Sequence, residues 1–213
     1  MQGSADFLKL GSCAERGHKK EKIAEYLSTQ EMSAKMHGVL KIVMSAENTF
    51  FQMRENPYMD EIYSRGFMTD LSKVRRNETS PLVYHKTFNY GDCVLEKRAA
   101  AAAGINEKIF INTKGQISEG TVCNVFFVRK NMIYTPQLSC GLLPGILREY
   151  IMERFQVTET IIYPDELMYY EECFVTNSLM GVMPVRQLGN ICFPHRAKAD
   201  EVRKVYEKEK MSL

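Results

Sequence analysis

Apolar and polar positions along the chain predict a mixed α+β protein with two regions. Glu21 to Leu27 repeats apolar residues at helical spacing, whereas Val39 to Met44 alternates in the way typical of a strand. A new strand is predicted to begin near Gly66. These elements indicate a small α+β unit over residues 1–63 and a larger domain over residues 66–213.

The larger domain carries most of the predicted elements. Residues 108–112, 122–128 and 132–134 are expected to form three strands of an antiparallel meander. A helix that Pro144-Gly145 opens is predicted over residues 146–155, and a closing helix over residues 198–210, where apolar residues recur on one face. Shorter elements are expected as a polar loop over 75–81, a helical turn over 164–170, a strand over 173–176 and a hairpin turn at Gly189-Asn190.

The stretch from Pro81 to Tyr90 carries the first candidate for chemistry. Its β-forming residues predict a strand that stops at Lys86, before a helix that Asn89 caps and Gly104 ends. A positive charge is disfavoured near helix N–H groups, and a half-buried amine there becomes a nucleophile. Such lysines form Schiff bases with carbonyls or with pyridoxal phosphate, although most lysines beside a strand end are simply solvated.

Composition limits the classes of function that the chain can serve. It has 213 residues, 45% hydrophobic and 25% charged, with a net charge of +2. That charge is too small to indicate binding to nucleic acid or to an anionic membrane, and no apolar run approaches the ~20 residues of a membrane span. Six cysteines lie far apart without CxxC pairs, which favours reduced thiols over disulfides or a metal site. With no secretory signal pattern, we expect a cytoplasmic protein.

Three further motifs follow Lys86 in a fixed order, at Ile117–Asn124, Leu142–Arg148 and Phe174–Val185. Together with the lysine stretch they resemble the fold-type-IV pyridoxal-phosphate enzymes, also called class IV aminotransferases. That family includes D-amino-acid and branched-chain aminotransferases and 4-amino-4-deoxychorismate lyases. The resemblance covers nearly the whole chain from Ser4 onward, and it implies a two-domain D-amino-acid-aminotransferase-like fold of the α+β class that forms a homodimer.

The resemblance also implies roles for individual residues. Lys86 would form the Schiff base with pyridoxal 5'-phosphate, and Glu119 would face the pyridine nitrogen, where a carboxylate stabilises the protonated ring. Ser118 to Gly120 is expected to break its strand, so that Glu119 turns into a cleft. Without the other motifs, an exposed turn glutamate would be the favoured interpretation of Glu119; together with them, the site is favoured.

The cofactor phosphate and the substrate carboxylate would each have their own binding groups. Ile146 and Leu147 would offer backbone N–H groups at a helix start, which bind anions well. Arg54, in a loop of the small unit, would bind the substrate carboxylate, because guanidinium binds carboxylate bidentately. Three residues at a strand end, Thr176, Asn177 and Ser178, would add side-chain donors to the phosphate. Of these, Asn177 and Ser178 are assigned as cofactor-binding residues. The alternatives are that Ile146 and Leu147 form an ordinary helix start, that residues 176–178 form a strand-end turn, and that Arg54 is a solvated arginine.

The start of the chain differs from the family pattern. The family's first small-domain strands, with an arginine that binds the cofactor phosphate, precede the segment that Ser4 to Leu10 resembles. We therefore expect a small domain truncated at its N-terminus, in which the strand at 39–44 lacks sheet neighbours.

The resemblance leaves three functions open, and it favours the first of them, a lyase. Asn177–Val185 and Cys140–Gly145 look closer to the lyases, which would make the chain a 4-amino-4-deoxychorismate lyase of folate biosynthesis that eliminates pyruvate to leave 4-aminobenzoate. An amino-acid transaminase, of the D-amino-acid or branched-chain type, would use the same lysine and glutamate on a small-molecule amino substrate. A truncated and catalytically incomplete family member is the third reading.

Overall fold

The structure, a computed structural model, describes residues 2–11, 20–30, 38–58 and 60–210. The chain divides into two compact units, Met1–Pro57 and Tyr58–Leu213. The break comes before helix α4 (Asp60–Arg65), whereas the sequence analysis placed the end of the small unit at residue 63. Among the described residues, every helix is too short or too polar to cross a lipid bilayer.

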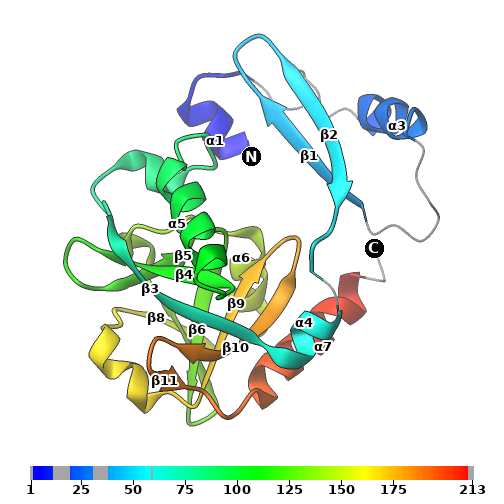
Figure 1. The fold of residues 1–213 in the computed structure, drawn as a ribbon. Helices are drawn as coiled ribbons and strands as arrows, with labels where there is room; N and C mark the ends of the chain where they lie inside the picture. The colour runs from blue at the N-terminus through cyan, green and yellow to red at the C-terminus, as the bar shows by residue number, and fades with distance from the viewer. Residues whose placement is uncertain (1, 12–19, 31–37, 59, 211–213) are drawn as a thin grey trace. The chain divides into compact units, whose positions relative to one another are not determined.

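The described residues of the first unit form two helices and a β-hairpin (Figure 1). Helices α1 (Gln2–Phe7) and α3 (Lys20–Ser28) precede the antiparallel strands β1 (Gly38–Met44) and β2 (Thr49–Glu55). The predicted helix at 21–27 and strand at 39–44 are therefore confirmed. The expectation that this strand lacks a neighbour was wrong, because β2 pairs with β1 along its full length.

The second unit is built on one mixed sheet with the strand order β5-β4-β3-β10-β9-β6-β7-β8, and β11 pairs with β10 (Figure 1). The sheet curls, so that β5 at one edge also contacts β6 and β7. The strands are β3 (Phe67–Arg76), β4 (Glu107–Asn112), β5 (Ile117–Gly120), β6 (Asn124–Arg129), β7 (Met132–Pro136), β8 (Val157–Thr160), β9 (Glu172–Asn177), β10 (Gly181–Leu188) and β11 (Ile191–Cys192).

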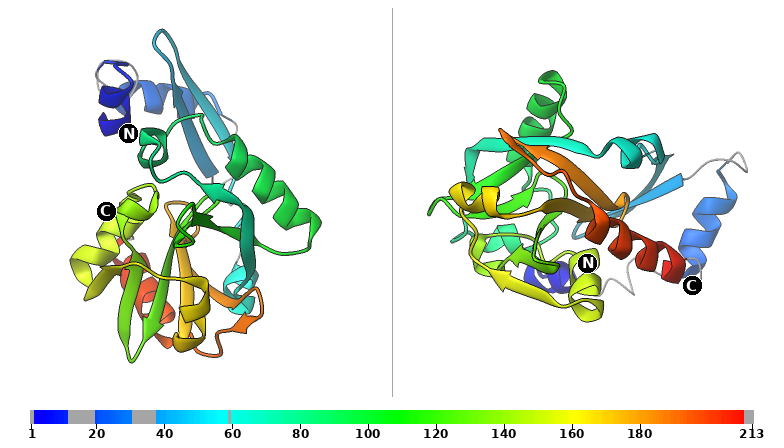
Figure 2. Two further views of the ribbon diagram at one scale, coloured as in Figure 1. Left: turned by 90° about the vertical axis from the view of Figure 1, so that its left-hand side faces the viewer. Right: turned by 90° about the horizontal axis from the view of Figure 1, so that it is seen from below.

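Helices cover the sheet on different sides, as Figure 2 shows. Helix α5 (Gly91–Ala102) packs on β3 and β4, whereas α6 (Ile146–Arg154) and α7 (Ala197–Lys210) pack on β9 and β10. The remaining helical turns are the 3₁₀ segments η1 (Pro81–Tyr84), η2 (Leu138–Cys140) and η3 (Pro164–Tyr169). Helices near the predicted 146–155 and 198–210 are thus confirmed.

Strand β6 shows why the core forms on both faces of the sheet. Successive side chains of a strand point to opposite faces. Val125 and Phe127 join the cluster inside the curled sheet, whereas Phe126 and Val128 join the cluster under α6 and α7. All four side chains are at most 2% exposed. Because both faces of β6 are buried, its sequence is an uninterrupted apolar run.

Two expectations about connectivity were wrong. Strands 108–112 and 122–128 do not form a meander, because β6 pairs with β9 and β7, while β4 lies between β3 and β5. Ser118 to Gly120 does not break a strand but is itself strand β5, paired with β4. Sequence neighbours are separated here because the sheet curls and inserts β3, β9 and β10 between them.

Candidate functional site

The lysine stretch folds differently from the prediction. Pro81–Tyr84 forms the 3₁₀ turn η1 instead of a strand, because Pro81 has no N–H to donate to a neighbouring strand and has a φ suited to a helical start. The hydroxyl of Tyr84 donates to the carbonyl of Glu78 at 2.7 Å and closes the loop. Lys86 follows in the loop before α5, where it is exposed. Tyr90, and not Asn89, is the N-cap of α5.

Glu78 anchors the loop that leads to Lys86. Its carboxylate accepts from the Thr113 backbone N–H and hydroxyl, at 3.2 and 2.8 Å. Gly141, with φ of +85°, lies so close that an added Cβ would stand 2.8 Å from Glu78 Cα. The loop predicted over 75–81 begins later than expected, since β3 runs to Arg76. Glu78 holds the middle of this loop against the ends of β4 and η2.

Glu119 is 4% exposed and lies on β5. Arg76, from the end of β3, donates a hydrogen bond from Nη2 to Glu119 Oε1, and the Leu143 N–H donates to Oε2 at 3.1 Å. Burial raises the pKa of Glu119, while the charges of Arg76 and Lys86 oppose that rise. The exposed Lys86 is thus near enough to act electrostatically on the buried carboxylate.

Arg76 is a site residue that sequence reasoning missed. Its guanidinium carbon lies 4.9 Å from the centre of the Phe110 ring, and Nη1 donates to Cys93 Sγ at 3.4 Å. The side chain is 15% exposed. The signal that could have found it is the continuation of strand β3, which the polar run Arg75-Arg-Asn-Glu-Thr-Ser80 concealed.

The loop from Leu143 to Gly145 links Glu119 to a helix start. Gly145 is the N-cap of α6 and supplies no side-chain cap, so the N–H groups of Ile146 and Leu147 are not capped by the described residues. Ile146 is 73% exposed, whereas Leu147 is buried in the core beneath the helix. Unsatisfied N–H groups at a helix N-terminus favour an anion.

Asn124 fixes the approach to this helix. Its side-chain Nδ2 donates to the Leu143 carbonyl at 2.9 Å. A Cβ added at Gly145 would stand 2.2 Å from Asn124 Oδ1, although Gly145 has an ordinary φ of −78°. Glycine is therefore required here by space, and not by backbone conformation.

We expect Gly145→Ala to lower the free energy of unfolding by about 1–3 kcal/mol, because Asn124 or the start of α6 must move. Gly91→Ala is the matched control, since Gly91 also lies at a helix start and has nothing within 4 Å of an added Cβ. That control should be neutral or stabilising by up to about 1 kcal/mol. Urea denaturation checks both variants, and equal midpoints would refute the requirement for space at Gly145.

The end of strand β9 lies beside this helix start, because Thr176 pairs with Asn124 across the two strands. Thr176 is 1% exposed, and its hydroxyl has no hydrogen-bond partner among the described residues. Asn177 uses its side chain locally: Oδ1 accepts from the backbone N–H groups of Leu179 and Met180, and Nδ2 donates to the Val122 carbonyl. Ser178 is exposed in the following turn. Of these three side chains, the geometry favours Thr176 as the donor to a ligand.

Arg54 lies in the first unit, on strand β2 opposite Val39, and it is exposed. The expectation that it belongs to a loop was wrong. The other predicted site residues, from Lys86 to Ser178, all lie in the second unit.

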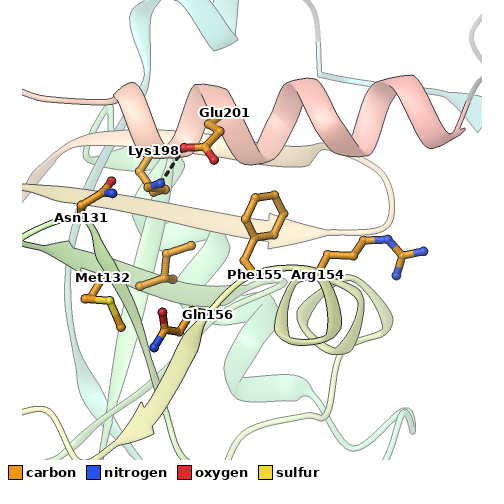
Figure 3. Close-up of a pocket in the computed structure, with 8 residues that line it drawn as sticks. Asn131, Met132, Arg154, Phe155, Gln156, Lys198 and Glu201 are labelled. Atoms are coloured by element: carbon orange, nitrogen blue, oxygen red, sulfur yellow. Dashed lines mark hydrogen bonds and ion pairs between the residues drawn. The ribbon is translucent and has the colours of Figure 1, made fainter.

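A separate depression of about 280 Å³ lies at the opposite end of α6 (Figure 3). Its charged lining is already paired, for example Lys198 Nζ with Glu201 Oε2 at 2.6 Å. It contains none of the predicted site residues; its lining is Asn131, Met132, Ile133, Arg154, Phe155, Gln156, Lys198 and Glu201. This depression is therefore distinct from the candidate site.

The family profile described as "Amino-transferase class IV" matches residues 1–188. The chain belongs to the class IV aminotransferase family. This is a family of pyridoxal-phosphate-dependent enzymes, so the resemblance drawn from the four motifs and the α+β fold expected from it are confirmed.

Class IV relatives of known sequence include the "Probable branched-chain-amino-acid aminotransferase" of Thermotoga maritima. It is 32% identical over 136 residues, which cover 60% of this chain and 48% of the relative. The chain thus spans about half the length of that relative.

Two solved class IV structures are similar in fold. A Thermotoga maritima structure, provisionally named a branched-chain amino acid aminotransferase, has a TM-score of 0.81 and 24% identity, and the match covers 100% of this chain and 78% of that one. A Legionella pneumophila structure, provisionally named a 4-amino-4-deoxychorismate lyase, has a TM-score of 0.70 and 26% identity over 76% of this chain and 61% of that one.

The residues present fit the family cofactor. Pyridoxal phosphate carries a phosphate dianion at one end and a ring nitrogen at the other, and it is held covalently by a lysine. An unpartnered buried hydroxyl at Thr176 and the uncapped start of α6 suit the phosphate. A buried carboxylate at Glu119 suits a protonated ring nitrogen, and Lys86 supplies the amine.

Proposed function

We propose that this chain binds pyridoxal 5'-phosphate through its second unit and acts on the amino group of a small-molecule amino substrate. The main observation in support of this proposal is the position of the loop from Leu143 to Gly145. It hydrogen-bonds the buried Glu119 at one end and presents the uncapped start of α6 at the other. One short segment therefore links a partner for the ring nitrogen to a binding site for the phosphate.

Each residue has a distinct task in this proposal. Bound pyridoxal phosphate supplies an electron sink that stabilises negative charge at the substrate α-carbon. Glu119 holds the ring nitrogen's proton, and that positive charge would in turn favour the ionised carboxylate against the effect of burial. Lys86 attaches the cofactor and then moves a proton at the α-carbon. Ile146, Leu147 and Thr176 bind the phosphate, while Asn177 and Ser178 shape the turn beside it.

Transamination is the reaction that we favour. The Thermotoga maritima relative, named "Probable branched-chain-amino-acid aminotransferase", is 32% identical over 136 residues. Arg54 on the first unit is the proposed partner of the substrate carboxylate, since a guanidinium binds it bidentately. A homodimer, in which a second copy completes the site, is part of this proposal, as is a small domain that corresponds to residues 1–63.

Elimination of pyruvate from 4-amino-4-deoxychorismate is the second candidate. The observation in its favour is the Legionella pneumophila structure, with a TM-score of 0.70, together with the lyase-like segments Asn177–Val185 and Cys140–Gly145. The two reactions differ in what they require. A transaminase needs a 2-oxo acid to accept the amino group, whereas the lyase releases pyruvate without one, so pyruvate formation with no added acceptor separates them.

The phosphate site is tested by Thr176→Val. Because the Thr176 hydroxyl has no hydrogen-bond partner within residues 2–11, 20–30, 38–58 and 60–210, its loss should leave the cofactor-free protein equally stable or up to about 1 kcal/mol more stable. Affinity for pyridoxal phosphate should fall about 10-fold, the value of one hydrogen bond to a charged group. Titration calorimetry and urea denaturation measure the two effects.

Thr135→Val is the matched control for the phosphate site. Thr135 is also fully buried on a strand, but its hydroxyl donates to the Val125 carbonyl at 2.8 Å. This variant should lose about 1 kcal/mol of stability and keep its cofactor affinity. The assignment of Thr176 is wrong if its variant loses stability and retains full affinity.

A further inference from the structure

The buried thiol of Cys93 has no part in the function proposed above, yet it lies in contact with the site. Cys93 is in the first turn of α5, the helix that follows Lys86, and it is 4% exposed. Its sulfur accepts a hydrogen bond from Arg76 Nη1 at 3.4 Å. The neighbouring nitrogen of the same guanidinium, Nη2, donates to Glu119. Arg76 thus bridges the thiol and the carboxylate.

Few contacts fix the orientation of this guanidinium. The ring of Phe110 supports its face at 4.9 Å, but Nε is buried and has no hydrogen-bond partner in the part of the chain that the structure describes. Among the described residues, the guanidinium of Arg76 donates hydrogen bonds in its own plane only to Cys93 and Glu119. Loss of the Cys93 contact would leave the guanidinium free to rotate about the axis of its one remaining hydrogen bond.

A thiol suits this task because it orients the arginine without sharing its charge. Burial raises the pKa of the Cys93 thiol, although Arg76 opposes that rise, so the sulfur is a neutral, weak acceptor. A carboxylate in its place would compete with Glu119 for the same cation. With a neutral acceptor, the full charge of Arg76 acts on Glu119.

We propose that Cys93 is a positioning residue that holds Arg76 against Glu119 and thereby keeps the Glu119 carboxylate ionised. This rests on the proposed function only in the role that it gives to Glu119. The charged and titratable groups that face Glu119 are Arg76 on β3, Lys86 in the loop, Cys93 on α5 and Cys123 after β5. Of these, Cys93 alone acts by directing Arg76.

The direct test is infrared titration of the protein without cofactor. The band of a protonated carboxyl that disappears in Glu119→Gln reports the protonation of Glu119 alone. In Cys93→Ala we expect its midpoint to rise by about one pH unit relative to the unaltered protein, because the attraction of Arg76 weakens. Cys93→Ser keeps an acceptor at this place, so it should restore the midpoint to within a few tenths of a pH unit.

Cys173→Ala is the matched control. Cys173 is buried to the same degree on β9, and its raised thiol pKa arises from burial alone. Both alanine variants remove one buried sulfur and should lose similar stability, but only Cys93→Ala should move the Glu119 midpoint. Equal midpoints in the two variants, or a Cys93→Ser midpoint equal to that of Cys93→Ala, would overturn the proposal.

The same variants separate this inference from the proposed function. If the unaltered protein binds no pyridoxal phosphate, the infrared titration still decides the role of Cys93. If pyridoxal phosphate binds to Lys86 and the Glu119 midpoint does not respond to Cys93→Ala, the function stands and the positioning role fails. With cofactor bound, Cys93→Ala should also shift the pH profile of its absorbance by about one pH unit.

Discussion

Lys86→Ala is expected to abolish covalent attachment of pyridoxal phosphate and to lower the rate of amino-group chemistry by about 10³-fold or more. The lysine both attaches the cofactor and moves a proton, so both tasks are lost together. Borohydride reduction followed by mass spectrometry of the peptide that contains residue 86 measures attachment. Because Lys86 is exposed, the free energy of unfolding should change by no more than about 0.5 kcal/mol.

Two further variants separate the possible contributions of Lys86. Lys86→Arg keeps a positive charge near Glu119 but offers no amine that can attack, so it should fail like the alanine variant. Lys114→Ala, on the exposed turn after β4, is the control and should keep both attachment and activity. Attachment at another lysine in the Lys86→Ala protein would contradict the assignment.

Arg76→Met is expected to cost about 3–5 kcal/mol of stability at neutral pH, since it leaves the Glu119 carboxylate buried without its cation. Glu119 should then be protonated over much of the accessible pH range and be unable to stabilise a protonated ring nitrogen. Cofactor affinity and activity should fall together. Urea denaturation and calorimetric titration with pyridoxal phosphate measure the two losses.

The stability of Arg76→Met is expected to depend on pH. Burial raises the pKa of Glu119 above its ordinary value of 4.5, and loss of Arg76 should raise it further. The folded variant then keeps a proton that the unfolded chain releases, so its stability falls as pH rises from about 4.5 to the folded pKa and is constant above it. The loss should therefore be smaller near about pH 5 than near about pH 8.

A double variant tests whether the uncompensated charge is the cause. Arg76→Met with Glu119→Gln removes both charges and keeps a side-chain oxygen to accept the Leu143 N–H. It should recover most of the stability at neutral pH, because neutral replacement of a buried pair is often tolerated. An equal loss at both pH values, or no recovery in the double variant, would show that packing of Arg76 on Phe110 matters more than charge.

Local sequence determined the elements that depend on short-range signals. The helical spacing at 21–27 and 198–210 and the alternation at 39–44 each gave an element within a few residues of its observed bounds. The four ordered motifs identified the family, which the profile match over residues 1–188 confirms. These motifs also identified Lys86, Glu119 and Ile146 as candidate site residues.

Tertiary structure decided the contacts that join residues far apart in the chain. The sheet brings Glu119 on β5 to Arg76 on β3, although α5 and β4 come between them in the chain, and it brings Glu119 to the Leu143 loop, although β6 and β7 come between those two. Whether Asn177 or Thr176 faces a ligand depends on which polar groups are already satisfied, and a strand-end motif does not encode that. Motifs report residue types in order, whereas burial, partners and charge pairing are properties of the packed chain.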